Sequence, residues 1–212
     1  MLSILHISDP HAQTETMNRL HNLAYSLPDC DVVALTGDCT SSTAPQLGDG
    51  LNEWPQKLKF SVPGNHDFPD TFDLLHAWEH RTPWSCVVDR VLFVGLDTSN
   101  GCGDVSDQLA TVANCDATAI VLLSHQWPES HENSAFEKPL ELFVGGRPLL
   151  ALHGHAHPSY FPGLLWDDAS PLATRLCYRS KVCSSVSGNR GLGHLITWDG
   201  RAFACRSVKG EW

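Results

Sequence analysis

Short apolar runs alternate with polar segments along this chain. Six runs, each four to six residues long and rich in Val, Ile and Leu, are typical of buried strands: Leu2–Ile7, Val32–Thr36, Lys59–Val62, Val91–Leu96, Ile120–Ser124 and Leu149–Leu152. Between the first two, apolar residues recur at helical spacing over Thr14–Leu27, which predicts a helix. A strand, a helix and a strand of this length predict a βαβ unit with parallel strands and a right-handed crossover.

The remaining pattern predicts two more helices and, late in the chain, a series of short strands. Helices are expected over Asp70–His80 and Val105–Ala113. After His157 the chain offers short strand-like runs, at Leu164–Trp166, Thr174–Arg179, Leu192–Trp198 and Arg201–Arg206. Asp199-Gly200 joins the last two and is a strong hairpin signal. We therefore expect a second, more antiparallel sheet from this part of the chain.

Three stretches rich in Gly, Pro and Ser are predicted to be loops, at 40–55, 126–146 and 158–163. Loops of this length are usually functional or disordered. They carry aromatic residues, namely Trp54, Trp127, Tyr160 and Phe161. Each could stack on a base, but packing against the fold is the commoner role of such a residue.

Length and composition indicate one soluble domain over residues 1–212. A chain of 212 residues with 42% hydrophobic content can bury a sizeable core. No apolar run approaches the roughly 20 residues of a membrane span. A strand pattern begins at Leu2, so a cleaved signal peptide would remove the first polar cluster. The eight cysteines include no C-x-x-C pair, and we expect free thiols in a cytoplasmic protein.

The balance of acidic and basic residues indicates which kind of substrate the protein binds. The chain has 14 basic and 24 acidic residues and a formal net charge of −10. Proteins that follow long nucleic acids present several Lys or Arg to the phosphates. No such cluster occurs here, which argues modestly against a nuclease and favours a small substrate.

Polar clusters, most of them directly after apolar runs, hold the candidate chemistry: Asp9-Pro10-His11, Gly37-Asp38, Gly64-Asn65-His66-Asp67, Ser124-His125 and Gly154-His155-Ala156-His157. Carboxylate, amide oxygen and imidazole without thiolate suit Mn, Fe, Zn, Co or Ni. Two such ions about 3.5–4 Å apart can clamp both oxygens of a displacement at phosphorus. Asp38 is the natural carboxylate to lie between them. Pro10 should bias Asp9 toward an extended backbone.

These clusters resemble, in order, the motifs of the calcineurin-like metallophosphoesterase superfamily. The resemblance spans Asp9 to His157 and implies a four-layer αββα sandwich of two mixed sheets flanked by helices. It implies two divalent metal ions, with Mn or Fe favoured. One metal would take Asp9, His11 and His157, the other Asn65, His125 and His155, and Asp38 would bridge them.

The resemblance also implies a mechanism. A metal-bound hydroxide would attack phosphorus, His66 would protonate or stabilise the leaving group, and Asp67 would orient the His66 ring. The G-N-H-D form resembles that of the small bacterial-type phosphodiesterases, and this resemblance favours small phosphodiesters such as cyclic nucleotides as substrates. The alternatives are a DNA or RNA nuclease or a phosphomonoesterase of the same fold, and a non-catalytic interaction scaffold.

The other seven histidines are expected to be structural or solvated. His6 and His153 lie in predicted strands, and three others lie in predicted helices, namely His21, His76 and His80. His131 follows His125 in a predicted loop, where a contact with substrate stays open, and His194 has no assigned role.

Overall fold

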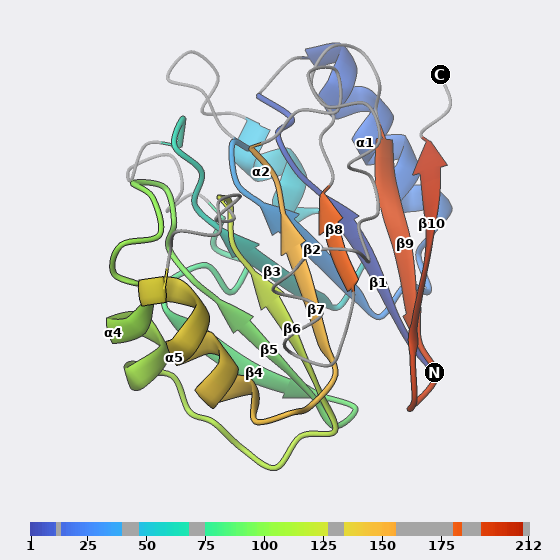
Figure 1. Ribbon diagram of the computed structural model, residues 1–212. Helices are drawn as coiled ribbons and strands as arrows, with labels where there is room; N and C mark the ends of the chain where they lie inside the picture. The colour runs from blue at the N-terminus through green and yellow to red at the C-terminus, as the bar shows by residue number, and fades with distance from the viewer. Residues whose placement is uncertain are drawn as a thin grey trace.

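A computed structural model of the protein describes residues 1–11, 14–39, 47–67, 75–126, 134–155, 180–183 and 192–209. Two five-stranded sheets pack face to face in this part of the chain, as Figure 1 shows. Both sheets mix parallel and antiparallel strands, because each has a row of parallel strands joined by crossovers and a hairpin at one edge.

The first sheet has the strand order β10-β9-β1-β2-β3. Strands β1 (Leu2–Ile7), β2 (Val32–Thr36) and β3 (Leu58–Val62) are parallel. Strand β9 (Leu192–Trp198) pairs antiparallel with β1 and with β10 (Phe203–Lys209). The three parallel strands therefore end at the same edge of the sheet.

The second sheet has the order β4-β5-β6-β7-β8. Strand β4 (Trp84–Val88) forms an antiparallel hairpin with β5 (Val91–Gly95). Strands β5, β6 (Ala119–Leu123), β7 (Leu149–His153) and β8 (Ser180–Cys183) are parallel. Their carboxyl ends also share one edge.

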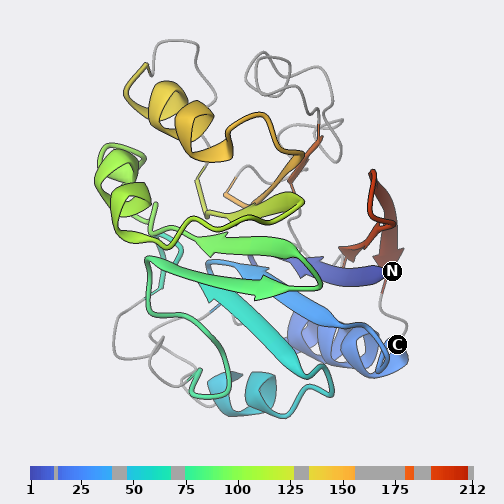
Figure 2. The same cartoon turned by 90° about the horizontal axis from the view of Figure 1, so that it is seen from below.

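Helices cover the two outer faces. Figure 2 shows α1 (Thr14–Ser26) and α2 (Leu47–Asn52) on the side of the first sheet, and α4 (Val105–Thr111) and α5 (Ser134–Val144) on the side of the second. The predicted helix over Thr14–Leu27 is confirmed, and its face of Met17, Leu20, Leu23 and Ala24 is buried. The predicted four-layer αββα sandwich of two mixed sheets is confirmed.

Three apolar clusters in the described part of the chain hold the layers together. The central one lies between the sheets and joins Ile4 and Phe60 of the first sheet to Phe93 and Val121 of the second. The other two lie under the helices: Leu5, Leu20 and Leu35 belong to one, and Leu92, Leu109 and Ile120 to the other. Strands buried on both faces explain why their sequences are continuous apolar runs.

The late part of the chain differs from the prediction. Strands β9 and β10 form the predicted hairpin, with Phe203 opposite Trp198. They do not build a second sheet, however, but extend the first one, where His6 and His194 stand opposite each other. The edge of β1 away from β2 offers unpaired backbone groups, and the hairpin satisfies them.

Three local predictions were also wrong. Residues 75–80 form no helix, because the Glu79 backbone pairs with β3: the Glu79 N–H donates to Lys59 O, and Glu79 O accepts from the Ser61 N–H, both at 2.8 Å. The predicted loops 40–55 and 126–146 contain α2 and α5. Strand β4 was not predicted. The prediction for residues 70–74 lies outside the described residues.

Candidate metal centre

The described parts of all five predicted clusters converge at one edge of the sandwich. Asp9, Asp38 and Asn65 follow β1, β2 and β3, while His125 and His155 follow β6 and β7. Parallel strands bring their carboxyl ends together, which is where open α/β sheets bind ligands. His157 lies outside the described residues, so its predicted role as a ligand stays a prediction.

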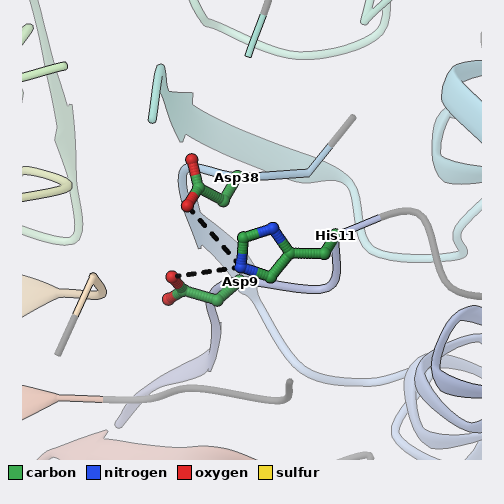
Figure 3. A group of neighbouring side chains, drawn as sticks. All are labelled: Asp9, His11 and Asp38. Atoms are coloured by element: carbon green, nitrogen blue, oxygen red, sulfur yellow. Dashed lines mark ion pairs between the residues drawn. The ribbon is translucent and has the colours of Figure 1, made fainter. Parts of the chain in front are cut away.

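Asp9, His11 and Asp38 form the first cluster. The His11 Nε2 lies 3.9 Å from Asp9 Oδ1 and 3.7 Å from Asp38 Oδ2, and Figure 3 shows the imidazole directed at both carboxylates. One ligand atom from each residue lies within 4.8 Å of the others. Both carboxylates are buried, Asp9 at 0% and Asp38 at 1% exposure. Two buried negative charges this close require a positive charge beside them.

Asn65, His125 and His155 form the second cluster. The Asn65 Oδ1 lies 2.9 Å from His125 Nε2 and 2.9 Å from His155 Nδ1. Asp38 links the two clusters, because its Oδ2 also lies 3.4 Å from His125 Nε2. This central position is the one a bridging carboxylate needs.

The orientation of the His125 ring tests whether a cation fits. Its Nδ1 lies 2.8 Å from Thr36 O, and a carbonyl oxygen can only accept, so Nδ1 carries a hydrogen. In the neutral ring Nε2 then presents a lone pair to the oxygens of Asn65 and Asp38. A cation between these atoms, either a proton or a metal ion, makes that arrangement favourable. Metal-binding imidazoles are commonly held in this way by the other ring nitrogen.

The pKa values of this pair reflect the same arrangement. Burial raises the pKa of Asp38, but His125, the N–H of His66 and the charge of His11 lower it below its ordinary value overall. Burial lowers the pKa of His125, yet contact with Asp38 and the charges of Asp9 and Asp38 raise it overall. The site therefore favours a carboxylate anion beside a positive charge.

His66 is exposed at the rim of this centre. Its backbone N–H donates to Asp38 Oδ1 at 2.8 Å, and its ring lies 5.3 Å from the His11 ring. An exposed imidazole beside the candidate metal ligands is accessible to a molecule that binds at this edge. Asp67 accepts hydrogen bonds from the Gly64 N–H at 2.8 Å and from the Cys39 thiol at 3.5 Å. These bonds fix the loop that carries His66.

Glycines allow the closest approaches between the clusters. A Cβ on Gly64 would collide with the Asp38 backbone and carboxylate, and a Cβ on Gly154 would collide with Ser8 and Asp9. Gly37 has a φ of +84°, and a Cβ there would lie 2.5 Å from His125 Nδ1. Gly37 allows a sharp turn through its positive φ, whereas Gly64 and Gly154 allow close packing.

Four of the predicted site residues that the structure describes adopt the left-handed backbone conformation. The φ angles are 55° at Asp9, 49° at His11, 52° at Asp38 and 65° at His155. The extended backbone expected at Asp9 from the following proline was therefore wrong. Asp and His tolerate this region better than most residues, and such strain is concentrated at functional sites.

The sequence reasoning missed the residues that position these side chains. Thr36 O accepts from both His125 and the Ser8 hydroxyl, the latter at 2.8 Å. Thr98 Oγ1 accepts from the backbone N–H groups of His125 and Gln126. In the sequence, the only feature that marks these positioning residues is that each is a polar residue at or near the end of a strand. Cys39 is buried, and burial raises the pKa of its thiol well above the ordinary value.

Of the six remaining histidines that the structure describes, four are buried and two, His21 and His76, are not. His6, His153 and His194 are buried in strands. His76 and His80 lie outside helices, and His80 is buried rather than solvated. Trp54 packs against Trp78, with ring centroids 5.9 Å apart, as expected for a core aromatic. His131 and the aromatics at 127, 160 and 161 lie outside the described residues.

The motifs and this geometry agree with a comparison against protein-family models. Residues 2–188 match the model of the calcineurin-like phosphoesterases. The chain belongs to this family. Its members are metal-dependent phosphoesterases that typically bind two metal ions, and the cluster of Asp9, His11 and Asp38 fits one such site.

Solved structures share the fold at low sequence identity. A dimetal phosphatase from Danio rerio superposes with a TM-score of 0.61 at 9% identity, over 99% of this chain and 96% of that chain. A purple acid phosphatase from yellow lupin seeds gives 0.59 at 12% identity, over 98% of this chain and 51% of that chain. The present chain therefore spans about half the length of the plant protein.

A third structural neighbour is not described as an enzyme. GAP50, the anchor in the inner membrane complex of Plasmodium, gives a TM-score of 0.55 at 12% identity, over 100% of this chain and 89% of that chain. No curated protein matched the chain. Among the helices of the described residues, none has the length and apolar character to cross a membrane.

Proposed function

We propose that this protein is a dimetal phosphodiesterase acting on small, nucleotide-like substrates. The observation that carries the proposal is the position of Asp38, whose Oδ2 lies 3.7 Å from His11 and 3.4 Å from His125. One carboxylate thus joins the two clusters, each built of the oxygen and imidazole ligands that suit Mn or Fe. When bound, two such ions would polarise the phosphoryl oxygens and activate a water molecule.

The residues of the chain would bind the ions, donate a proton and hold the loop that carries the proton donor. Asp9, His11 and His157 would hold one ion, and Asn65, His125 and His155 the other. His66 is exposed beside His11, with their rings 5.3 Å apart, so its imidazole can donate a proton to the leaving oxygen. Asp67 keeps the loop of His66 in place through the Gly64 N–H and the Cys39 thiol.

The charge of the chain supports a small substrate. Two divalent ions would bring the formal net charge from −10 to about −6, so attraction for phosphate is confined to the centre. A DNA or RNA nuclease would need further basic contacts along the backbone of its substrate. A phosphomonoesterase is the nearer alternative, because the same centre binds either ester.

A scaffold role is the alternative from another class of function, since GAP50 shares the fold. The presence of His66 and of the Asp38 bridge position favours catalysis. We also propose a cytoplasmic location, which is supported by the free thiols of the six cysteines whose side chains the structure describes.

One set of assays tests the proposal. The protein is loaded with Mn²⁺, and kcat/KM is measured for a bis-aryl phosphate, the matched monoester and a 2′,3′-cyclic nucleotide. We expect the diesters to react at least about tenfold faster than the monoester, with little cleavage of duplex DNA on gels. An Asp9→Asn variant prepared identically controls for a contaminating phosphatase.

Other results would overturn the proposal. A clear monoester preference would make the protein a phosphomonoesterase, and efficient DNA cutting at physiological salt would make it a nuclease. Metal binding without turnover of any ester would favour the scaffold.

A further inference from the structure

A buried hydroxyl lies against the loop that carries His125. The Thr98 Oγ1 accepts hydrogen bonds from the backbone N–H of His125 at 2.9 Å and from that of Gln126 at 2.8 Å. Thr98 is 0% exposed. A hydroxyl oxygen has two lone pairs, so one loop uses the whole acceptor capacity of this side chain.

Thr98 is in turn held from helix α4. The Asp97 N–H donates to Gln108 Oε1 at 2.7 Å, and Gln108 Nε2 donates to Asp97 O at 2.7 Å. The amide of Gln108 therefore pairs with both backbone groups of the residue before Thr98. Gln108 is only 8% exposed, so water competes little for these bonds.

These contacts leave His125 with little freedom. Thr98 fixes its N–H, the Gly154 N–H donates to its carbonyl oxygen at 3.0 Å, and its Nδ1 donates to Thr36 O at 2.8 Å. With the backbone and one ring nitrogen fixed, Nε2 is directed at Asp38 and Asn65. The bond from Thr98 goes to the backbone N–H of His125, so Thr98 acts on the ligand nitrogen through the His125 backbone.

We propose that Thr98, held by Gln108, is the positioning residue for His125 and sets the affinity of the metal site formed by Asn65, His125 and His155. The inference rests on the proposed dimetal function. Removing the hydroxyl would leave two buried N–H groups without an acceptor. The loop would then shift to reach water, and the ligand nitrogen would move with it.

The test compares isosteric variants. Thr98→Val removes the acceptor and keeps the shape, Thr98→Ser restores the hydroxyl, and Gln108→Glu loses the donor to Asp97 O. Thr118→Val is the matched control, because Thr118 donates to Arg90 O at 3.0 Å near the opposite ends of the strands. Mn²⁺ binding is measured by calorimetry, and amide hydrogen exchange by NMR in the metal-free protein.

We expect Thr98→Val to weaken one of the two Mn²⁺ sites by about 10–100-fold and to lower the exchange protection of the His125 and Gln126 amides by about tenfold. Thr98→Ser should have the Mn²⁺ affinity and the amide protection of the wild type, and so should Thr118→Val. Gln108→Glu should give values between those of the wild type and those of Thr98→Val.

Two results would overturn the proposal. One is unchanged Mn²⁺ affinity with lost amide protection, which would mean that the bonds are structural only. The other is unchanged protection in Thr98→Val, which would mean that Thr98 does not hold the loop. If the wild type binds no Mn²⁺, the proposed dimetal function fails, and the proposed effect of Thr98 on metal affinity fails with it. In that case the hydrogen-exchange data on the metal-free protein still show whether Thr98 holds the loop.

Discussion

The backbone N–H of His155 donates to both carboxylate oxygens of Asp9, at 3.2 and 3.1 Å. The two residues follow strands of different sheets, β1 and β7, and lie 146 positions apart in the sequence. This bond joins the first motif of the chain to the last, and it forms only because Gly154, which has no side chain, packs against Ser8 and Asp9. The centre thus depends on contact between the sheets.

Gly154→Ala should destabilise the protein by about 1–3 kcal/mol, the usual cost of overpacking a buried position. Its Cβ would push Asp9 away from His155 and weaken metal binding as well. Unfolding in urea and Mn²⁺ calorimetry measure the two effects. Gly103→Ala is the control, because nothing lies within 4 Å of a Cβ built there. Equal stability of both variants would show that the sheets separate without cost.

Asp38→Asn should reduce the occupancy of both metal ions, since a bridging carboxylate contributes charge to each. Metal analysis of the purified variant gives the result directly. Asp89→Asn serves as the control, because Asp89 has a positive φ of 48°, close to the 52° of Asp38, but lies in a turn far from the centre. Two ions retained per chain in Asp38→Asn would mean that Asp38 does not bridge.

His66→Gln should keep both ions and slow turnover by about 10²–10⁴-fold, the range for a lost general acid. The loss should be smaller for a nitrophenyl ester, whose leaving group needs no proton. His21→Gln is the control, because His21 lies on helix α1 and packs against Tyr25. An equal loss for good and poor leaving groups would favour phosphate positioning over proton donation.

The metal-free protein should lose stability below about pH 6.5 because of the buried His194. Burial lowers the pKa of His194 from 6.5 to about 4. The unfolded chain therefore takes up a proton over this window while the folded protein does not, so stability falls as the pH falls. The pKa of the facing His6 is lowered as well, by burial and then by the charges of His194 and His153.

Urea unfolding at pH 7.5 and pH 5 measures this effect. The decrease in the free energy of unfolding from pH 7.5 to pH 5 should be about 2 kcal/mol smaller in His194→Leu than in the wild type. His21→Gln should show the wild-type loss. If His194→Leu loses as much stability as the wild type, His194 is not the group responsible.

The apolar runs and the polar clusters after them were readable from the sequence because they are local. Strand β2 is the run Val32–Thr36, and Asp38 follows it two residues later. A strand buried on both faces must be apolar throughout, and a ligand at its end must be polar. The parallel order then follows from the helix between β1 and β2, so the meeting of Asp9 and Asp38 was also predictable.

What the sequence could not provide depends on partners distant along the chain. The hairpin of β9 and β10 satisfies the free edge of β1 rather than starting its own sheet, and the Glu79 backbone pairs with β3 instead of forming a helix. The left-handed backbone of Asp9 and the bond from His125 to Thr98 exist only in the assembled site. Local propensity decides single elements, but unpaired backbone edges and buried polar groups are satisfied only when the tertiary structure brings their partners together.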